Sequence, residues 1–271
     1  MDQPAAEADR SVAEVWDPEE HPEVLVERRG RTVFVWLNRP DRLNALDWGL
    51  RLGLEKLWRI LGRDRDLRCV VVTGKGRGFC AGAHMDDLAA ERHPNGPSVH
   101  DEISFVPGFQ LDVPVVVGVN GVCAGGGLHF VADADIVVAA ESATFLDPHL
   151  YVGQVSGIEP PSLALRLPPP VLNRLVLLGR AGRMDAPTAF AAGMLSEVVA
   201  DGELEARLAE IAAVLETASP TALSATRRVM RRLEWSLVGA AMQEGWEAVQ
   251  DQWSHPDAVE GPQAFLERRP P

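Results

Sequence analysis

The chain has 271 residues, of which 46% are hydrophobic and 24% charged, so it is long enough and apolar enough to bury a substantial core. Its 26 basic and 39 acidic residues give a formal charge of −13, which repels nucleic-acid phosphates and anionic membrane surfaces. The composition therefore predicts a globular protein and argues against nucleic acid as a partner.

The N-terminal segment, the apolar runs and the cysteines indicate where the protein is located. Residues 1–22 are acidic and contain proline, without the basic start and apolar run of a secretory signal, so we expect a flexible N-terminal arm. Apolar runs elsewhere fall short of the roughly 18 residues that a membrane span needs, so no membrane partner is expected. Three scattered cysteines, Cys69, Cys80 and Cys123, fit neither a disulfide framework nor a metal site. A cytoplasmic location is the simplest expectation.

Strands and helices alternate in the first half of the chain. Residues 31–37 and 68–73 are β-branched and aromatic runs, and residues 48–61 between them carry leucines at helical spacing. The runs at 113–119 and 134–140 repeat this pattern, and their near-continuous valine and isoleucine predict strands that are covered on both faces. The first half is therefore predicted to be α/β.

The second half is predicted to be mainly helical. Strand signals almost vanish after residue 160, and we find no internal repeat and no linker that would separate independent domains. The segments that predict helices are 170–179, 185–194, 201–217, 220–236 and 237–253.

Two glycine-rich loops each follow a predicted strand. They are TGKGRGFCAGAHMDDL at 73–88 and NGVCAGGGLHF at 120–130. Three consecutive glycines weaken a helix start by roughly 1 kcal/mol each relative to alanine, so a need for bare backbone is indicated. Backbone N–H groups in both loops can point at one anionic oxygen. An ordinary strand-to-helix turn is the simpler alternative, and a phosphate-binding loop is a poorer match to the spacing.

Four segments together resemble the crotonase superfamily, also called the enoyl-CoA hydratase/isomerase family. Their order and spacing extend over almost the whole chain after residue 23. The segments are LNRPDRLNAL (37–46), VVVTGKGRGFCAGAHMDDL (70–88), PVVVGVNGVCAGGGLHFVADADIVVAAESATF (114–145) and AFLERRPP (264–271).

The resemblance implies a fold, an assembly and a substrate. It implies an α/β fold with a crotonase-like spiral ββα core over residues 23–200, followed by a helical oligomerisation region over residues 201–271. Homotrimers, in some cases paired into hexamers, are implied as well. The substrate would be an acyl-CoA thioester with coenzyme A as part of the substrate, and no metal or redox cofactor would be needed.

The resemblance also implies two kinds of binding residue. The backbone N–H groups of Ala83 and Gly126 would form an oxyanion hole for the thioester carbonyl, where donors aimed at developing charge contribute several kcal/mol. Other matching positions would bind the substrate or its coenzyme A part: Asn44, Ala45, Leu46, Ala81, His84, Met85, Gly125, Phe265 and Arg268.

The chain departs from the family pattern at the acid/base positions. Where hydratases of the family carry two glutamates, this sequence has His129 and, in FLDPHLYVG, His149. Histidine can serve as a general acid or base near neutral pH. Glu159 follows His149 by ten residues, and the pair resembles the histidine–acid dyad of the β-diketone hydrolases of the superfamily. His129 as a core residue and Glu159 as an ordinary helix-start acid are the alternatives.

Three functions follow as expectations. The first is an acyl-CoA-processing enzyme of enoyl-CoA hydratase/isomerase type, with His149 as principal acid/base and His129 as second proton-transfer or water-holding group. The second is a carbon–carbon bond hydrolase that cleaves a β-dicarbonyl compound with a His149–Glu159 dyad. The third is a catalytically silent acyl-CoA binding protein.

Overall fold

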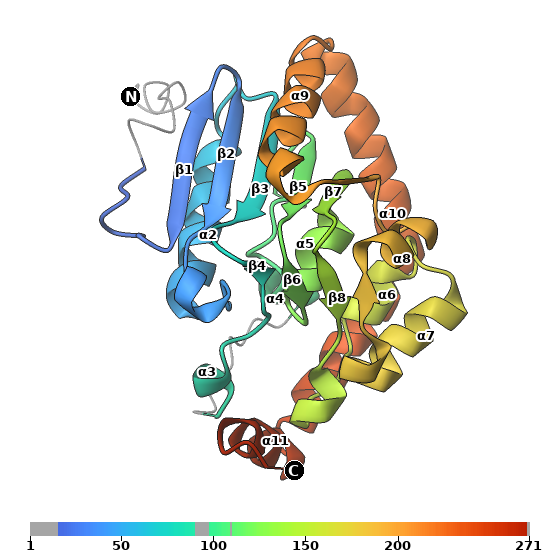
Figure 1. Ribbon diagram of the computed structural model, residues 1–271. Helices are drawn as coiled ribbons and strands as arrows, with labels where there is room; N and C mark the ends of the chain where they lie inside the picture. The colour runs from blue at the N-terminus through green and yellow to red at the C-terminus, as the bar shows by residue number, and fades with distance from the viewer. Residues whose placement is uncertain (1–15, 90–97, 109, 270–271) are drawn as a thin grey trace, which may run out of the picture.

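Two β-sheets form the centre of the structure, a computed structural model that describes residues 16–89, 98–108 and 110–269 (Figure 1). The larger sheet has the strand order β1-β2-β3-β5-β7-β10, in which β1 and β2 are antiparallel and the other neighbours parallel. Its strands are β1 (Val24–Arg29), β2 (Thr32–Leu37), β3 (Cys69–Gly74), β5 (Val115–Val119), β7 (Ile136–Ala140) and β10 (Glu197–Val199).

The smaller sheet has the order β4-β6-β8-β9, with β9 antiparallel to β8. Its strands are β4 (Gly78–Cys80), β6 (Val122–Ala124), β8 (Thr144–Leu146) and β9 (Met184–Asp185). The chain passes from β3 to β4, from β5 to β6 and from β7 to β8, so each turn adds one strand to each sheet. This winding confirms the predicted α/β class, and the strands expected at 31–37, 68–73, 113–119 and 134–140 correspond to β2, β3, β5 and β7.

The central strands β2, β3, β5 and β7 of the larger sheet are buried on both faces, as the valine-rich runs predicted, whereas the edge strands β1 and β10 are only partly buried. Along β3, Cys69 and Val71 face a core layer under helix α9 (Leu204–Glu216), whereas Val70 and Val72 face the main core on the other side. Helix α9 lies across one face of this sheet (Figure 1). The alternation follows from the two-residue period of a strand.

Helix α2 (Trp48–Leu61) forms where the leucine spacing predicts it. Asp47 caps its N-terminus by accepting a 2.9 Å hydrogen bond from the Leu50 N–H. One face of the helix is buried in the main core through Leu50, Leu54, Leu57, Trp58 and Leu61. The Trp58 indole N–H donates to the Phe105 carbonyl at 2.7 Å.

The remaining helices cover the second half of the chain and the loops beside the sheets. The short ones are η1 (Pro40–Arg42), α3 (Met85–Ala89), α4 (Val99–Glu102), α5 (Gly127–Asp133), η2 (His149–Val152), α6 (Glu159–Leu163), η3 (Gly179–Gly182), α8 (Ala186–Ala191) and η4 (Asp201–Glu203). The longer ones are α7 (Pro169–Leu178), α10 (Pro220–Gln252) and α11 (Asp257–Leu266). None of the helices in the described part combines the length and apolar character that crossing a bilayer requires.

One helix boundary was predicted wrongly. We expected separate helices at 220–236 and 237–253, but α10 continues through both segments for 33 residues. Gly239, which weakens the sequence signal, is accommodated because the Trp235 indole packs where a side chain at Gly239 would lie. A glycine that provides room for a neighbouring side chain does not have to end a helix.

The described part begins inside the expected N-terminal arm. Residues 1–15 of that arm lie outside the described residues. Trp16 is buried in the main core and stacks on the His21 ring, with centroids 5.4 Å apart.

Helix α10 packs directly on the loop that precedes α6. Gly245 of α10 faces the backbone of Gly157, and a Cβ on either glycine would overlap the carbonyl oxygen of the other. Since Glu159 follows Gly157 by two residues, this backbone contact fixes the start of α6 against α10.

Replacing Gly245 by alanine is expected to destabilise the protein by about 2 kcal/mol, because the new methyl group must displace backbone rather than a flexible side chain. Urea unfolding measures the change. Gly202→Ala is the matched control, since nothing lies within 4 Å of the added Cβ, and its effect should stay within about 0.5 kcal/mol. Equal unfolding midpoints for the two variants would contradict the proposed contact.

Candidate active site

The two glycine-rich loops meet just after the C-terminal ends of β4 and β6. A Cβ placed on Gly82 would lie 2.8 Å from the Ala124 carbonyl oxygen and 3.2 Å from the Gly126 nitrogen. Gly82 and Gly125 also adopt φ angles of +87° and +48°, in the left-handed region that favours glycine. The absence of side chains at these turns is therefore what allows the two backbones to approach.

The approach brings the amides of Ala83 and Gly126 to one place. A Cβ built on Gly126 lies 3.8 Å from the Ala83 nitrogen. Leu46 bridges the first loop by donating to the Gly82 carbonyl at 2.8 Å and accepting from the His84 N–H at 2.9 Å, which leaves the Ala83 N–H outside this bridge. Ala83 and Gly126 both line one cavity, and their service as an oxyanion hole stays a prediction.

This cavity, named the catalytic cavity for the role proposed below, has a volume of about 120 Å³ and is also lined by the titratable residues singled out from the sequence. Its lining residues are Leu46, Arg51, Ala83, Leu88, Glu102, Phe105, Gly126, His129, His149, Gln154, Val155, Ile158, Glu159, Trp246, Val249 and Trp253. The structure therefore places His129, His149 and Glu159 together with both amides.

Glu159 joins the two histidines. Its Oε1 atom lies 3.0 Å from His129 Nε2 and 3.4 Å from His149 Nε2, and its side chain is only 5% exposed. Helix α5 supplies His129 directly after the glycine turn, and α6 begins with Glu159. One buried carboxylate thus contacts both imidazoles.

Asp147 fixes His149 from the other side. The fully buried Asp147 carboxylate accepts hydrogen bonds from the His149 ring at 2.6 Å, from the His149 backbone N–H at 3.1 Å and from the Ser156 hydroxyl at 2.5 Å. Each ring nitrogen of His149 therefore faces a carboxylate. We name the contacts from Asp147 through His149 and Glu159 to His129 the histidine–carboxylate chain.

The two carboxylates hold His149 in its protonated form. Burial alone would lower the pKa of His149, but the charge of Glu159 and the hydrogen bond to Asp147 outweigh burial and raise the pKa to about 9. Burial also opposes ionisation of Glu159, yet the neighbouring charge of His149 and the contacts of His129 hold the pKa of Glu159 well below its usual range. At neutral pH the pair is an imidazolium beside a carboxylate.

The same residues are the potential metal ligands. Asp147, His149 and Glu159 offer atoms that all lie within 4.8 Å of one another. His149, however, directs a different ring nitrogen at each carboxylate, so the imidazolium itself provides the positive charge between them. The described donor set therefore fits a protonated histidine better than a metal ion.

A groove of about 410 Å³ adjoins the catalytic cavity and shares Ala83 with it. Five of the predicted substrate residues line this groove, namely Ala45, Ala81, His84, Met85 and Phe265. Three arginines that sequence reasoning missed line it as well: Arg42, Arg180 and Arg183. The Arg180 guanidinium carbon lies 5.7 Å from the centroid of the Phe265 ring.

The other predicted substrate residues lie elsewhere. Leu46 lines the catalytic cavity, and a Cβ on Gly125 would contact the His149 ring at 3.4 Å. Asn44 is fully buried, and its side chain accepts from the Arg39 N–H at 2.7 Å and donates to the Lys75 and Gly78 carbonyls at 3.0 and 2.8 Å. Arg268 is exposed and lines neither cavity described above.

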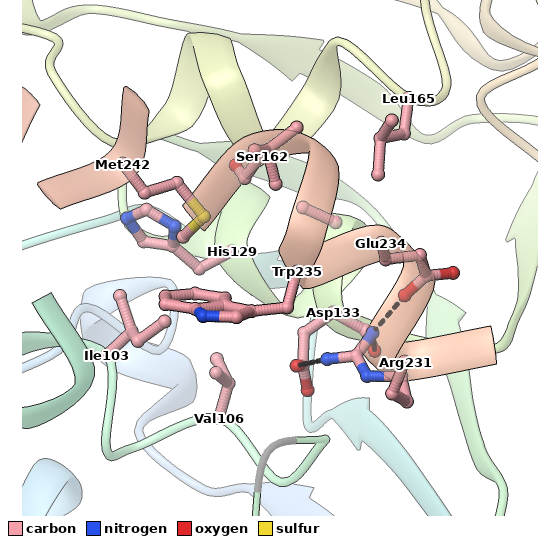
Figure 2. A pocket seen from close by; sticks show the side chains of 12 residues that line it. Ile103, Val106, His129, Asp133, Ser162, Leu165, Arg231, Glu234, Trp235 and Met242 are labelled. Atoms are coloured by element: carbon pink, nitrogen blue, oxygen red, sulfur yellow. Dashed lines mark hydrogen bonds and ion pairs between the residues drawn. The ribbon is translucent and has the colours of Figure 1, made fainter. Parts of the chain in front are cut away.

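A second, smaller cavity of about 40 Å³ lies on the far side of His129 (Figure 2). Figure 2 shows His129 next to Met242, with the Trp235 indole below them and the Ile103 and Val106 side chains below the indole. Arg231 closes one end by pairing with Asp133 and Glu234. His129 therefore separates the catalytic cavity from a mostly apolar chamber under α10.

Comparison with known proteins agrees with this geometry. The family model described as enoyl-CoA hydratase/isomerase matches residues 28–271. The chain belongs to the enoyl-CoA hydratase/isomerase family. The expected crotonase fold is thereby confirmed.

Relatives from this family cover nearly the whole chain. Enoyl-CoA hydratase EchA19 of Mycobacterium tuberculosis is 32% identical over 261 residues, which is 93% of this chain and 97% of the relative. The carnitinyl-CoA dehydratase of Salmonella typhi is 32% identical over 264 residues, or 90% and 95% of the two chains. The crystal structure of carnitinyl-CoA hydratase from Mycobacterium avium is 30% identical with a TM-score of 0.81, covering 92% of this chain and 97% of that one.

Sequence reasoning on this family member missed the polar neighbours of the site. Asp147 stands two residues before His149, and that proximity was the one available signal for a partner of the ring. Arg51 and Glu102 lie far apart in the chain, and no local pattern connects them with the cavity they line.

Stability is expected to depend on the protonation of His149. Because the folded protein raises this pKa from 6.5 to about 9, the stabilisation is fully present below about pH 6.5 and is lost as the pH rises through about 9. The loss should be on the order of 2–3 kcal/mol in the free energy of unfolding. Urea unfolding between pH 6 and pH 10 measures it.

Two variants test the origin of this pH dependence. His149→Gln should remove the alkaline loss, whereas His255→Gln, at a histidine whose side chain is 60% exposed, should retain it. If wild-type protein and His149→Gln lose the same stability over this pH range, His149 is not the titrating group.

Proposed function

We propose that the protein is an acyl-CoA-processing enzyme of the enoyl-CoA hydratase/isomerase type that stabilises a thioester enolate and moves protons through its histidine–carboxylate chain. The observation that supports this most directly is that Ala83 and Gly126 line one cavity together with His149 and Glu159. Relatives named as hydratases and as a dehydratase support reversible addition of water to an acyl-CoA as the reaction.

The amides would act on the thioester carbonyl. As the reaction moves electrons from the double bond onto the carbonyl oxygen, the negative charge develops between the Ala83 and Gly126 N–H groups. Fixed donors aimed at that charge do not have to reorganise during the reaction, and removing one such donor costs about 100- to 1,000-fold in rate.

The histidine–carboxylate chain would supply one base and one acid. Glu159 accepts a proton from water while the water oxygen bonds to the β-carbon, and the electron pair of the double bond passes to the enolate oxygen. His149, protonated at neutral pH, then donates its proton to the α-carbon as the enolate collapses. Asp147 is a positioning residue that orients the ring and stabilises the imidazolium.

The contact between Glu159 and His149 would restore the site. After one turnover Glu159 carries a proton and His149 lacks one, and the 3.4 Å separation between Glu159 Oε1 and His149 Nε2 allows direct return of that proton. In other hydratases of the family, two glutamates remove the proton from water and protonate the α-carbon. Here Glu159 and His149 would perform these two steps by sharing one proton.

A carbon–carbon bond hydrolase is the second candidate, and the same contact between His149 and Glu159 favours it. In that reaction neutral His149 removes a proton from water, the resulting hydroxide attacks a ketone, and the enolate leaves toward the oxyanion hole. Since this step needs unprotonated His149, its rate should rise as the pH approaches 9.

Two substrates separate these functions. We expect hydration of crotonyl-CoA, followed by loss of ultraviolet absorbance, with a rate that falls as the pH rises through about 9 because the acid is lost. Cleavage of a cyclic β-diketone with a rate that rises toward pH 9 would instead support the hydrolase. Turnover of neither compound, with tight acyl-CoA binding, would identify a silent acyl-CoA binding protein.

Variants of the histidine–carboxylate chain test the assigned roles. His149→Gln and Glu159→Gln should each lower kcat by about 100- to 10,000-fold. The double variant should be little worse than either single one, because both residues act on the same proton. His255→Gln serves as the control with unchanged kcat, and an unchanged kcat in His149→Gln would remove that residue from the mechanism.

The arginines of the groove are expected to bind the phosphates of coenzyme A. Arg180→Ala and Arg183→Ala should each weaken the binding of coenzyme A about tenfold in calorimetric titrations, with a weaker dependence of Kd on salt. Arg232→Ala, at an exposed position on α10, is the control and should not change Kd. Unaltered binding in both groove variants would place the nucleotide elsewhere.

A further inference from the structure

An ion pair in the wall of the catalytic cavity has no part in the proposed proton transfers. Arg51 of α2 and Glu102 at the end of α4 both line this cavity. The Arg51 Nη1 atom lies 2.9 Å from Glu102 Oε1, and Arg51 Nη2 donates to the Glu102 backbone carbonyl at 2.6 Å. Their side chains are only 13% and 16% exposed.

The pair lies close to the histidine–carboxylate chain. The Arg51 guanidinium carbon is 4.9 Å from the centroid of the Phe105 ring, and Phe105 packs edge-on against His129 with centroids 6.0 Å apart. Burial raises the pKa of Glu102 although Arg51 opposes this, and the charges of His129 and Glu159 also act on it. The ion pair is therefore within electrostatic reach of the catalytic groups.

The pair is incompletely hydrogen-bonded. Arg51 Nε and Glu102 Oε2 are both buried, and neither has a hydrogen-bond partner in the described structure. A buried polar atom without a partner costs about 1–3 kcal/mol, so such an arrangement calls for an explanation. One donor and one acceptor of the same ion pair therefore lack a partner within a wall of the cavity.

The neighbouring wall offers no similar polar group. Apart from the catalytic residues and Gln154, it is built largely from apolar side chains: Leu46, Leu88, Phe105, Val155, Ile158, Trp246, Val249 and Trp253. A plain hydrocarbon chain would fit such a wall, but next to Arg51 and Glu102 it would leave both polar atoms unsatisfied.

We propose that Arg51 and Glu102 select an acyl-CoA whose acyl group carries a hydroxyl group beyond the reacting α- and β-carbons. A hydroxyl both donates and accepts, so it can donate to the Glu102 carboxylate and accept from the Arg51 guanidinium. The pair has no net charge, so it gives a charged substituent no overall attraction. This inference rests on the proposed function, because it takes an acyl-CoA as the ligand.

The selectivity is expected because a hydrocarbon substituent would leave the polar atoms of Arg51 and Glu102 without hydrogen-bond partners. A site built to hydrogen-bond a substrate hydroxyl rejects the analogue without it more strongly than an apolar pocket rejects a change in size. Replacing both charged residues by leucine should reverse the preference, because two apolar side chains can fill the same space without an uncompensated charge.

Binding of saturated acyl-CoA pairs tests this selectivity independently of turnover. Calorimetry would compare butyryl-CoA with 4-hydroxybutyryl-CoA and pentanoyl-CoA with 5-hydroxypentanoyl-CoA. For wild-type protein we expect the hydroxylated member of at least one pair to bind tenfold or more tightly. The double variant Arg51→Leu/Glu102→Leu should abolish or reverse this ratio.

Two further variants keep the test decisive. Glu102→Gln retains shape while removing the charge, and it should reduce the ratio even if the double leucine variant fails to fold. Arg207→Leu/Glu197→Leu removes a more exposed pair, with contacts of 2.6 and 2.8 Å, and should leave the ratio unchanged.

The outcomes distinguish this inference from the function on which it rests. Equal affinity of wild-type protein for both members of each pair would overturn the selectivity while acyl-CoA binding stands. A preference for the hydroxylated ligand that persists in Glu102→Gln and in the leucine variant would overturn the role of the ion pair. Absence of binding to every acyl-CoA would overturn the proposed function itself.

Discussion

The contact between two backbone turns determines the geometry of the whole site. Gly82 lies against Ala124 and Gly126 so closely that a methyl group on Gly82 would push the turns apart. Gly127 is equally restricted, since its Cβ would lie 2.6 Å from the Cys80 carbonyl oxygen. These glycines cost conformational entropy on folding. They also allow the two amides to come closer together than residues with side chains would permit.

The charges around His149 depend on that placement. The ring lies between Asp147 and Glu159, and α5, which starts at the glycine turn, brings His129 to the other side of Glu159. Buried charges are costly unless they are paired and hydrogen-bonded, and each charge here has a partner. Because each charge is stabilised by its neighbours, a change of protonation at one member of the histidine–carboxylate chain alters the charge balance at the other members.

Local sequence patterns predicted the parts of the structure that depend on local chemistry. The valine-rich strands, helix α2 and the two glycine turns follow from side-chain period and backbone freedom, and all are present. The pairing of His149 with Glu159 could be proposed because the ten-residue offset between them resembles that of the histidine–acid dyad of the β-diketone hydrolases.

The features that escaped prediction depend on distant parts of the chain. Arg51 and Glu102 belong to different elements, and only the packing of α2 against the segment after α4 brings them together. In the sequence, Gly239 suggests a helix boundary. The structure shows instead that the Trp235 ring fills the space beside Gly239 and that the helix continues. The shared contact of His129 and His149 with one carboxylate oxygen likewise requires coordinates.

Helix α10 and the residues that follow it supply Trp246, Val249 and Trp253 to the wall of the catalytic cavity. The C-terminal segment is therefore an integral part of the enzyme chamber as well as an outer layer of the molecule (Figure 1). A recombinant fragment that stops at residue 200 would contain the residues of both glycine turns and of the histidine–carboxylate chain, but it would lose the Gly245 contact that fixes the start of α6 and open the cavity to bulk solvent. If C-terminal segments were exchanged between family members, part of the cavity wall would therefore be exchanged together with the helix.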